Sequence, residues 1–544
     1  MTAEPVRSGV LAGPLALAAV ALLALAASIS GLANGFTYDD IHIVVNNAHV
    51  HSLAEPWLRF TERYWPPEVG VGLYRPVTIL LYGVQWAIGA GAPLVFHLAS
   101  IGLYAVAAVL FLLVARRLLP PVAALAAAAL WAVHPVHVEA VANIVGQSEI
   151  VAALALFGAI LVYLDGREGD TFTPRKQAAV SVLYLLACLT KEHGLILPAL
   201  LLALEFTVLA DRPRPAGLRR FYLLLAVLGL GFFAVRTAVL GDLAGDLPPY
   251  WMTGISTGQR WLTMLAVVPQ WIRLLLWPAH LQADYGPREL ELATAFGPAQ
   301  ALGALLLISI AALALTLRRR QPVITLGVLI AGIALLPTSN LLLPTGIALA
   351  ERTLFLPSAG ICLSLGACLV LLFEKAPALT RALVPVLVLA GLGWSAWRQP
   401  VWKDNMTLFR QMTVDAPLSY RAHWGYGSML FDAGQREKGF RELEIANSLY
   451  GRDSGLILEM ARRLRNVGAC KAAVPLYRQA MAVEQSDDLK SGTRTVLILC
   501  LFDLKEFAAA RDEARAGQAS LIMASQFKDM EHFADSALAA QPKP

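Results

Sequence analysis

Long apolar runs, each close to the length of a membrane-crossing helix, fill the first 400 residues of the chain. A helix needs ~20 apolar residues to cross the ~30 Å hydrocarbon core of a bilayer. Shorter runs can cross when flanking residues extend them or the bilayer adapts. Eleven runs meet or approach this length: residues 10–32, 94–115, 119–134, 149–164, 177–190, 194–210, 221–240, 299–317, 322–337, 354–373 and 382–398. The sequence therefore predicts an all-α, polytopic membrane domain over residues 1–400 with about eleven crossings.

One further apolar segment, residues 259–278, is interrupted by Arg260, Arg273 and Pro278. If it crossed, the basic loop 318–321 would lie on the opposite side from the other basic loops, against the positive-inside bias. We therefore expect an interfacial or re-entrant segment. With a cytoplasmic N-terminus, the eleven crossings then place the basic loops inside and the C-terminal region outside.

The first apolar run, from Val10 to about Leu32, lacks a convincing signal-peptidase site. Its length suits a crossing helix better than the shorter core of a secretory signal. We expect it to be kept as the first membrane helix.

Composition supports a membrane protein: 57% of the residues are hydrophobic and only 15% are charged. The net charge is +5, and the basic residues gather between apolar runs, as at Arg116-Arg117 and Arg318-Arg319-Arg320. That pattern is typical of cytoplasmic loops and does not indicate a nucleic-acid surface. The five cysteines show no paired spacing of the kind found in zinc sites or disulfide frameworks, so we predict that all five are packing residues.

The C-terminal part, residues 401–544, changes to a charged, alanine-rich sequence with helical periodicity. From Tyr420 it can be divided into units of ~34 residues, the tetratricopeptide period. Gly434 and Gly468 are 34 positions apart, where paired helices would turn, whereas a third unit, about Leu489 to Ile522, lacks the turn glycine. The pattern predicts a short repeat solenoid that binds a polypeptide on its concave face; a plain helical bundle is the alternative.

Candidate chemistry lies in the loops predicted to be outside. Asp39 and Asp40 follow the first apolar run, and two adjacent carboxylates in a partly dehydrated site favour a raised pKa or a cationic partner. Such a group could act as a general base toward a hydroxyl. A solvated turn or a helix cap is an equally valid interpretation of the pair.

His134, His137 and Glu139 could suggest a metal site, but Pro135 interrupts the helix between the histidines. Hydrogen bonds to a phosphate or a sugar, or a helix cap, suit them better. Three cations are expected at the outer membrane surface, where an anionic lipid headgroup would lie: Arg75, Lys191 and Arg352. Each could instead extend to ordinary phospholipid, and Glu351 with Arg352 could form a structural ion pair.

Taken together in order, these motifs resemble the transmembrane and tetratricopeptide-repeat-containing O-mannosyltransferases, polytopic enzymes of the GT-C glycosyltransferase class. The motifs that carry the resemblance include Tyr38-Asp39-Asp40, Tyr74-Arg75-Pro76, His134-Pro135-Val136-His137-Val138-Glu139, Val145-Gly146-Gln147-Ser148-Glu149, Lys191-Glu192-His193, Ala283-Asp284-Tyr285 and Ala350-Glu351-Arg352. The repeat array is shorter than is usual in that family. The alanine- and leucine-rich composition suggests a bacterial relative in the inner membrane, with the catalytic loops and repeats in the periplasm.

The resemblance implies a sugar transfer, with mannose as the expected sugar, from a polyprenyl or dolichyl monophosphate lipid to a Ser or Thr hydroxyl of a protein. Asp39 matches the first acidic position of the family and would be the base, with Asp40 as its helper. The residues expected at the donor phosphate and sugar are Arg75, His134, His137, Glu139, Lys191, Glu192, Asp284, Tyr285, Glu351 and Arg352. No metal site and no obligatory cofactor are expected beyond the lipid-linked sugar phosphate, and no nucleic acid is expected as a partner. A non-catalytic membrane scaffold with partner-binding repeats, or a transporter, are the competing functions.

Overall fold

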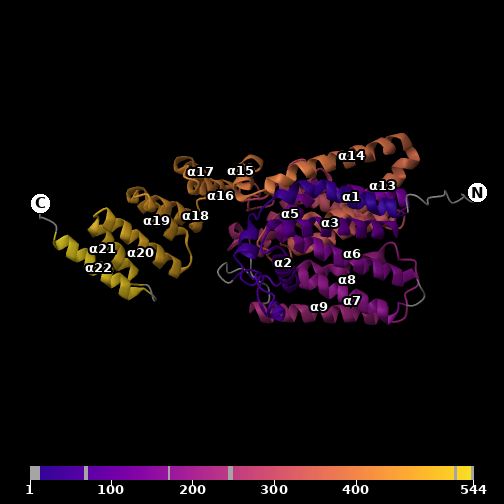
Figure 1. Cartoon of the computed structure of the whole chain (residues 1–544), viewed down its shortest axis with the longest axis horizontal. Coiled ribbons are helices and arrows are strands. Elements are labelled where there is room, and N and C mark those ends of the chain that lie inside the picture. The colour runs from indigo at the N-terminus through magenta and orange to yellow at the C-terminus, as the bar shows by residue number, and fades with distance from the viewer. Residues whose placement is uncertain (1–12, 67–71, 169–171, 243–248, 520–522, 541–544) are drawn as a thin grey trace, which may run out of the picture. The chain divides into compact units, whose positions relative to one another are not determined.

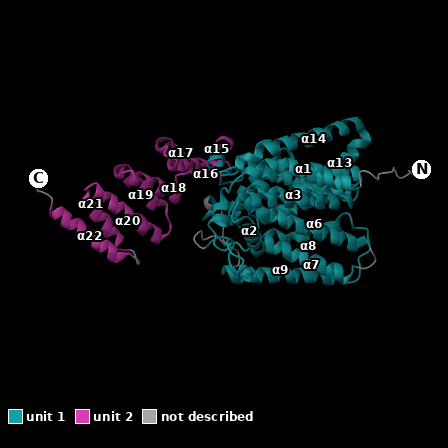
Figure 2. Cartoon of the chain, viewed as in Figure 1, with its two compact units in different colours: residues 1–285, 290–408 teal, residues 286–289, 409–544 magenta. Residues whose placement is uncertain are grey.

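The structure is a computed structural model that describes residues 13–66, 72–168, 172–242, 249–519 and 523–540 (Figure 1). Within these ranges the chain is helical and forms no β-strand. The predicted start of the first run at Val10 and the end of the third repeat at Ile522 lie outside them. The chain divides into two compact units (Figure 2): residues 1–285 with 290–408, and residues 286–289 with 409–544.

Every apolar run predicted to cross the membrane forms a helix in unit 1. The helices of this unit are α1 (Pro14–Ser28), α2 (Pro76–Gly89), α3 (Pro93–Arg116), α4 (Pro121–Ala132), α5 (Val138–Ala142), α6 (Gln147–Glu168), α7 (Pro174–Thr190), α8 (Leu197–Phe206), α9 (Leu218–Leu240), α10 (Thr257–Leu276), α11 (Pro298–Leu317), α12 (Pro322–Leu335), α13 (Phe355–Lys375) and α14 (Pro377–Arg398). Many begin with proline, whose missing N–H is not needed at a first helical position and whose fixed φ suits it.

Seven helical segments of the described residues are long and apolar enough to cross a membrane, or eight if α4 and α5, which meet at a bend of 46°, form one span. Three of the eleven predicted crossings, α7, α8 and α12, contain only 17, 10 and 14 residues. Length and composition therefore give fewer spans than the eleven predicted, because these runs end early at polar or irregular segments. Unit 1 is a multi-pass membrane domain by the same criterion.

The segment predicted to be interfacial or re-entrant forms α10, a 20-residue helix with Pro269 inside it. It is not among the candidate spans of the described residues. One face of α10 is buried, as at Met264 and Trp271, whereas Trp261 is exposed. Whether α10 lies in the interface or re-enters the membrane stays a prediction.

Packing of unit 1 depends on small residues and large aromatic rings. Helix α3 lies against α6 (Figure 1), and α6 with α7 and α12 with α13 form further packed pairs. Between α12 and α13, a Cβ on Gly327 would overlap the backbone of Gly360, so only glycine permits this approach. Close backbone contact through small residues is the usual way in which helices associate in lipid. Trp131 on α4 is fully buried in the core.

The chain leaves unit 1 at the end that carries Asp39. Ser30 donates to the carbonyl oxygen of Ala396 (2.7 Å), and Asn34 donates to that of Gln399 (3.0 Å). Just beyond, the Tyr38 N–H donates to Asn405 Oδ1 (2.8 Å). The loop after the first helix and the segment after the last one are therefore bound together.

Helix α15 (Asn405–Asp415) begins in unit 1, and the helices that follow belong to unit 2: α16 (Tyr420–Asp432), α17 (Arg436–Leu449), α18 (Ser454–Asn466), α19 (Cys470–Val483), α20 (Asp487–Asp503), α21 (Phe507–Gly517) and α22 (Ala524–Ala539). The turn glycines lie where the repeat period predicts: Gly434 (φ +82°) joins α16 to α17, and Gly468 (φ +80°) joins α18 to α19. The third turn uses Lys505 at φ +59°, a conformation that costs a non-glycine residue free energy.

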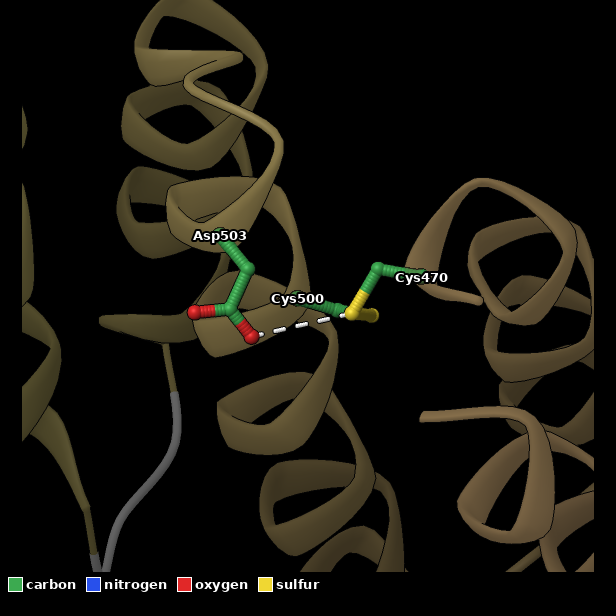
Figure 3. The surroundings of a disulfide bond; sticks show 3 residues. All are labelled: Cys470, Cys500 and Asp503. Carbon is green, nitrogen blue, oxygen red and sulfur yellow. Dashed lines mark hydrogen bonds between the residues drawn. A yellow bond between two sulfur atoms is a disulfide. The ribbon is translucent and has the colours of Figure 1, made fainter. Parts of the chain in front are cut away.

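The prediction that all five cysteines are packing residues is wrong for two of them. Cys470 on α19 and Cys500 on α20 form a disulfide, with their Cα atoms 5.4 Å apart (Figure 3). Their sequence separation of 30 residues gave no signal, because the helices face each other only after the repeats pack. Asp503 Oδ2 lies 3.6 Å from Cys470 Sγ, where only the reduced thiol could donate a hydrogen bond.

Candidate functional site

Ionisable side chains from six separate segments of unit 1 meet at or near helix ends. Arg75 directly precedes α2, Lys191 follows α7, and Arg352 lies in the single turn Glu351–Leu354 before α13. Each of these cations contacts at least one carboxylate. The chain places them there because apolar helices end where charged residues begin, and ionisable groups are costly inside lipid.

Arg352 bridges two carboxylates that are far apart in sequence. Its Nη2 lies 3.2 Å from Asp39 Oδ2, and its Nη1 lies 3.0 Å from Glu139 Oε1. The backbone N–H of Arg352 also donates to Glu139 Oε2 (2.9 Å). Glu139 is buried and held by two bonds, whereas the Asp39 side chain is 22% exposed and has one oxygen in the ion pair. Asp39 is therefore the carboxylate that an incoming group could reach.

Unlike Asp39, Asp40 is fully buried and accepts hydrogen bonds from backbone N–H groups. Its Oδ1 accepts the N–H of Val145 (2.9 Å), and its Oδ2 accepts the N–H groups of Ile144 (3.3 Å) and Thr37 (3.2 Å). Burial raises the pKa of Asp40 to about 7, although these three donors favour the charged form. The carboxyl group joins the Asp39 loop to the single turn Ile144–Gly146.

The other two cations also form ion pairs. Arg75 Nη2 and Nε lie 2.8 and 3.0 Å from Glu192 Oε2, and the guanidinium lies 5.0 Å from the ring centre of Tyr64. Burial would raise the pKa of Glu192, but the charges and hydrogen bonds around it, those of Arg75 above all, together lower it. Lys191 is buried against Glu149 in the first turn of α6.

The ion pairs belong to one electrostatic cluster. Burial lowers the pKa of Lys191 to about 8; the Glu149 charge opposes this shift, and the charges of Arg75 and Arg352 add to it. His193, beside Lys191 in the chain, is buried and uncharged, because burial and the Lys191 charge lower its pKa to about 4. Seven ionisable groups meet here: Asp39, Glu139, Glu149, Glu192, Arg75, Lys191 and Arg352. The cluster is thus close to neutral, with four carboxylates and three cations.

The two histidines are engaged away from this cluster. His137 lies between Tyr104 and Ser358, with ring nitrogens 2.8 and 2.7 Å from their hydroxyl oxygens. His134 Nε2 contacts the carbonyl oxygen of Leu275 (3.2 Å), and its Nδ1 accepts the N–H of Val136, which caps the turn Pro135–His137. The cap proposed as an alternative for these residues is therefore the role that His134 has in the fold.

The remaining predicted residues lie beside the cluster. Glu351 is buried and accepts hydrogen bonds from the Tyr285 hydroxyl (2.9 Å) and from the backbone of Gln282. It does not pair with Arg352, so the structural ion pair suggested for these neighbours does not form; consecutive residues point in different directions. Asp284 is half-buried. Within the described ranges, no group of three or more His, Cys, Asp or Glu residues could hold a metal ion.

Three residues of the site were given no role there by the sequence prediction. Glu149 pairs with Lys191, and Tyr64 lies under Arg75. Asn143 is fully buried just before Ile144 and Val145, whose N–H groups bind Asp40, and neither polar atom of its side chain has a hydrogen-bond partner among the described residues. An acidic residue in the first turn of an apolar span could have identified Glu149. The buried amide of Asn143 could be found only from the structure.

Comparison with known proteins gives relatives of one kind. No protein-family model matches the chain. It is 27% identical to a protein O-mannosyl-transferase of Caenorhabditis elegans, over 75% of this chain and 58% of the relative. Human protein O-mannosyl-transferase TMTC1 is 25% identical over 83% of this chain and 57% of its own length. These relatives are animal proteins, so the expectation of a bacterial source is not borne out.

Among solved structures, the archaeal oligosaccharyltransferase AglB from Archaeoglobus fulgidus, in complex with an inhibitory peptide and a dolichol-phosphate, has a TM-score of 0.40 at 15% identity, covering 71% of this chain and 55% of that one. A TM-score this low does not establish a common fold. The chain spans between half and three-fifths of the lengths of the curated relatives compared here. The predicted resemblance is confirmed: over most of its length the chain is similar to curated protein O-mannosyl-transferases.

Proposed function

We propose that the chain is a membrane glycosyltransferase of the GT-C kind. It moves a sugar, mannose by analogy with the names of its relatives, from a polyprenyl or dolichyl monophosphate to a Ser or Thr hydroxyl of a protein. The observation that carries the proposal is the Asp39–Arg352–Glu139 bridge, which presents one accessible carboxylate beside a cation at the end of a membrane helix bundle.

In the proposed reaction, the acceptor hydroxyl oxygen forms a bond to the anomeric carbon as the bond between that carbon and the phosphate oxygen breaks. Asp39 takes the hydroxyl proton, and the departing lipid phosphate gains one negative charge. Protonated Asp39 no longer neutralises Arg352, so the guanidinium becomes available to the phosphate at the step when its charge increases. Stabilisation of developing charge by a fixed donor is an effective way to accelerate transfer.

The other groups of the cluster would hold the donor. Arg75 and Lys191 would bind the phosphate, with Glu192 and Glu149 keeping them in place. Glu351, Asp284 and Tyr285 lie beside the bridge and would contact the sugar, whereas His134 and His137 would support the site through their backbone and hydroxyl contacts. A monophosphate leaving group carries less charge than a nucleotide diphosphate, so the proposal requires no obligatory metal ion.

Replacement of Asp39 tests the proposal. Removal of a general base lowers the rate ~10²–10⁴-fold, while an amide preserves the shape. We therefore expect purified Asp39→Asn protein to bind the donor lipid normally and to lose transfer to an acceptor peptide, with Glu55→Gln, an exposed carboxyl on the same loop, as the matched control. Transfer by Asp39→Asn at near the wild-type rate would reject the assignment, and the absence of transfer by wild-type protein with intact donor binding would favour a scaffold or a transporter.

The repeats would select the acceptor. No cluster of acid–base or phosphate-binding residues comparable to that of unit 1 was predicted in them. Deletion of the chain beyond Tyr420 should therefore reduce modification of a protein acceptor much more than hydrolysis of the lipid donor. The melting temperature of the shortened protein must match that of unit 1 in the full chain. Equal loss of both activities in a folded protein would contradict this division.

The site and the repeats would lie on the same, non-cytoplasmic side of the membrane. Two observations support this: the Asp39 loop is bonded to the segment that leads into the repeats, and disulfides such as Cys470–Cys500 form mainly in oxidising compartments. In a background with the exposed Cys368 replaced by serine, cysteines placed at His42 and Arg452, both exposed, should react with a membrane-impermeant reagent from one and the same side. Labelling from opposite sides would exclude this topology.

A further inference from the structure

A lateral groove lies between α8 and α12, beyond the cluster described above. Its volume is about 410 Å³, within the range of ~300–1,000 Å³ typical of ligand pockets. Leu202 and Phe206 of α8 line one wall, and Leu329 and Ile333 of α12 line the other. The groove is therefore mainly apolar and lies in the membrane domain.

Helix α8, which forms one wall of the groove, is short. Its 10 residues rise ~15 Å, about half of the hydrocarbon core. Helix α8 ends at Phe206, and α9 begins only at Leu218. Leu202 is 53% and Phe206 is 38% exposed on the open side. An apolar groove that opens toward lipid is filled by a hydrocarbon chain more readily than by water.

One end of the groove is positively charged. Arg214 lines it, and the guanidinium of Arg318 lies 3.8 Å from the ring centre of Phe206. The Nε of Arg318 is buried and has no hydrogen-bond partner within the described part of the chain. Arg214 belongs to the loop after α8 and lines the groove together with Phe206, and Arg318, which follows α11, lies against the Phe206 ring.

The acidic residue of the groove does not cancel this charge. Glu205 Oε1 lies 2.6 Å from Arg167 Nε, and its Oε2 lies 3.1 Å from Arg167 Nη2. The Tyr163 hydroxyl also donates to Glu205 (2.7 Å). Since Arg167 neutralises Glu205, Arg214 and Arg318 leave the end of the groove with a net positive charge.

We propose that this groove binds an anionic phospholipid, with one acyl chain along α8 and α12 and the phosphate headgroup between Arg214 and Arg318. Basic pockets between membrane helices are suited to anionic headgroups, whereas the added ammonium of a zwitterionic headgroup cancels the attraction. The site is distinct from the Asp39–Arg352 cluster and does not depend on the proposed sugar transfer.

Native mass spectrometry of the purified full chain, with phosphatidylglycerol or phosphatidylcholine of identical acyl chains, tests the site. We expect tighter binding of phosphatidylglycerol. Each cation near a lipid headgroup contributes a factor of about 5, so Arg214→Gln with Arg318→Gln should weaken its binding by about 30-fold. Arg319→Gln with Arg320→Gln, which removes the same charge from exposed residues of the neighbouring loop, is the matched control.

A second variant tests the part of the site that would hold the acyl chain rather than the headgroup. Leu329→Trp should fill the groove and reduce binding of phosphatidylglycerol while leaving both arginines in place. Equal binding of the two phospholipids, or equal weakening by the control pair, would overturn the proposal. Preferential displacement of phosphatidylglycerol by a polyprenyl phosphate would overturn it too, because the groove would then belong to the tail of a donor lipid.

Discussion

Arg352 Nη2 and Asp39 Oδ2 lie 3.2 Å apart although 313 residues separate them in the chain. The contact joins the loop after the first membrane helix to the turn before α13, and Glu139 on the other side of the guanidinium fixes its orientation. One cation thus holds the carboxylate proposed as the base in position.

This contact predicts that variants of Arg352 and of Asp39 have different defects. Arg352→Gln should abolish sugar transfer and also weaken donor binding, because it removes a cation from the phosphate site and leaves buried Glu139 without its partner. Asp39→Asn should affect transfer alone. Titration of a donor lipid against both variants, with stability followed in parallel, distinguishes them. Equal donor affinity in the two proteins would count against phosphate binding by Arg352.

The pH dependence of donor binding follows from Lys191. The folded-state pKa of about 8 lies below the ordinary 10.5, so the ammonium loses its proton as pH rises through about 8, earlier than an exposed lysine would. Affinity for an anionic donor should then be constant from pH 6.5 to 7.5 and fall above pH 8. Measurement of the dissociation constant over that range checks this, and Lys191→Gln should bind more weakly and lose the decline. If the affinity of the variant still declined above pH 8 to the same extent, the decline would be caused by a group other than Lys191.

Replacement of Asn143 is expected to lower activity without lowering stability. Its buried amide makes no hydrogen bond within the described residues, and replacement of an unsatisfied buried polar group by an apolar one of similar shape is close to neutral or stabilising. If the amide binds a hydroxyl of the donor sugar, Asn143→Leu should keep the melting temperature and reduce kcat/KM by roughly 10-fold or more, as expected for one lost hydrogen bond of ~1.5 kcal/mol. Full activity in a stable variant would make Asn143 a packing residue.

Stability of the repeats should respond to their turn residues. Lys505 occupies the left-handed region that glycine occupies at Gly434 and Gly468. Lys505→Gly should therefore raise the free energy of unfolding of unit 2 by up to about 1 kcal/mol, and Gly468→Ala should lower it by a similar amount. Thermal unfolding, monitored by limited proteolysis of the repeats, measures the stability of both variants. A destabilised Lys505→Gly protein would show that the lysine side chain contributes more than its backbone conformation costs.

The sequence by itself determined the properties that are local along the chain. The apolar runs specify helices because ~20 consecutive nonpolar residues have few other stable states in lipid, and glycines at a spacing of 34 specify repeat turns because only residues that tolerate a positive φ fit there. The order of short motifs also sufficed to predict the similarity to protein O-mannosyl-transferases.

Only the tertiary structure decided which residues meet. The pairs Asp39–Arg352, Glu149–Lys191 and Cys470–Cys500 form across 313, 42 and 30 residues, and each depends on how whole helices pack. Periodicity places a side chain on a face of its own helix but does not specify the helix that covers that face. The different roles of adjacent Asp39 and Asp40 have the same origin, because one faces a cation at the surface of the site and the other binds buried backbone N–H groups.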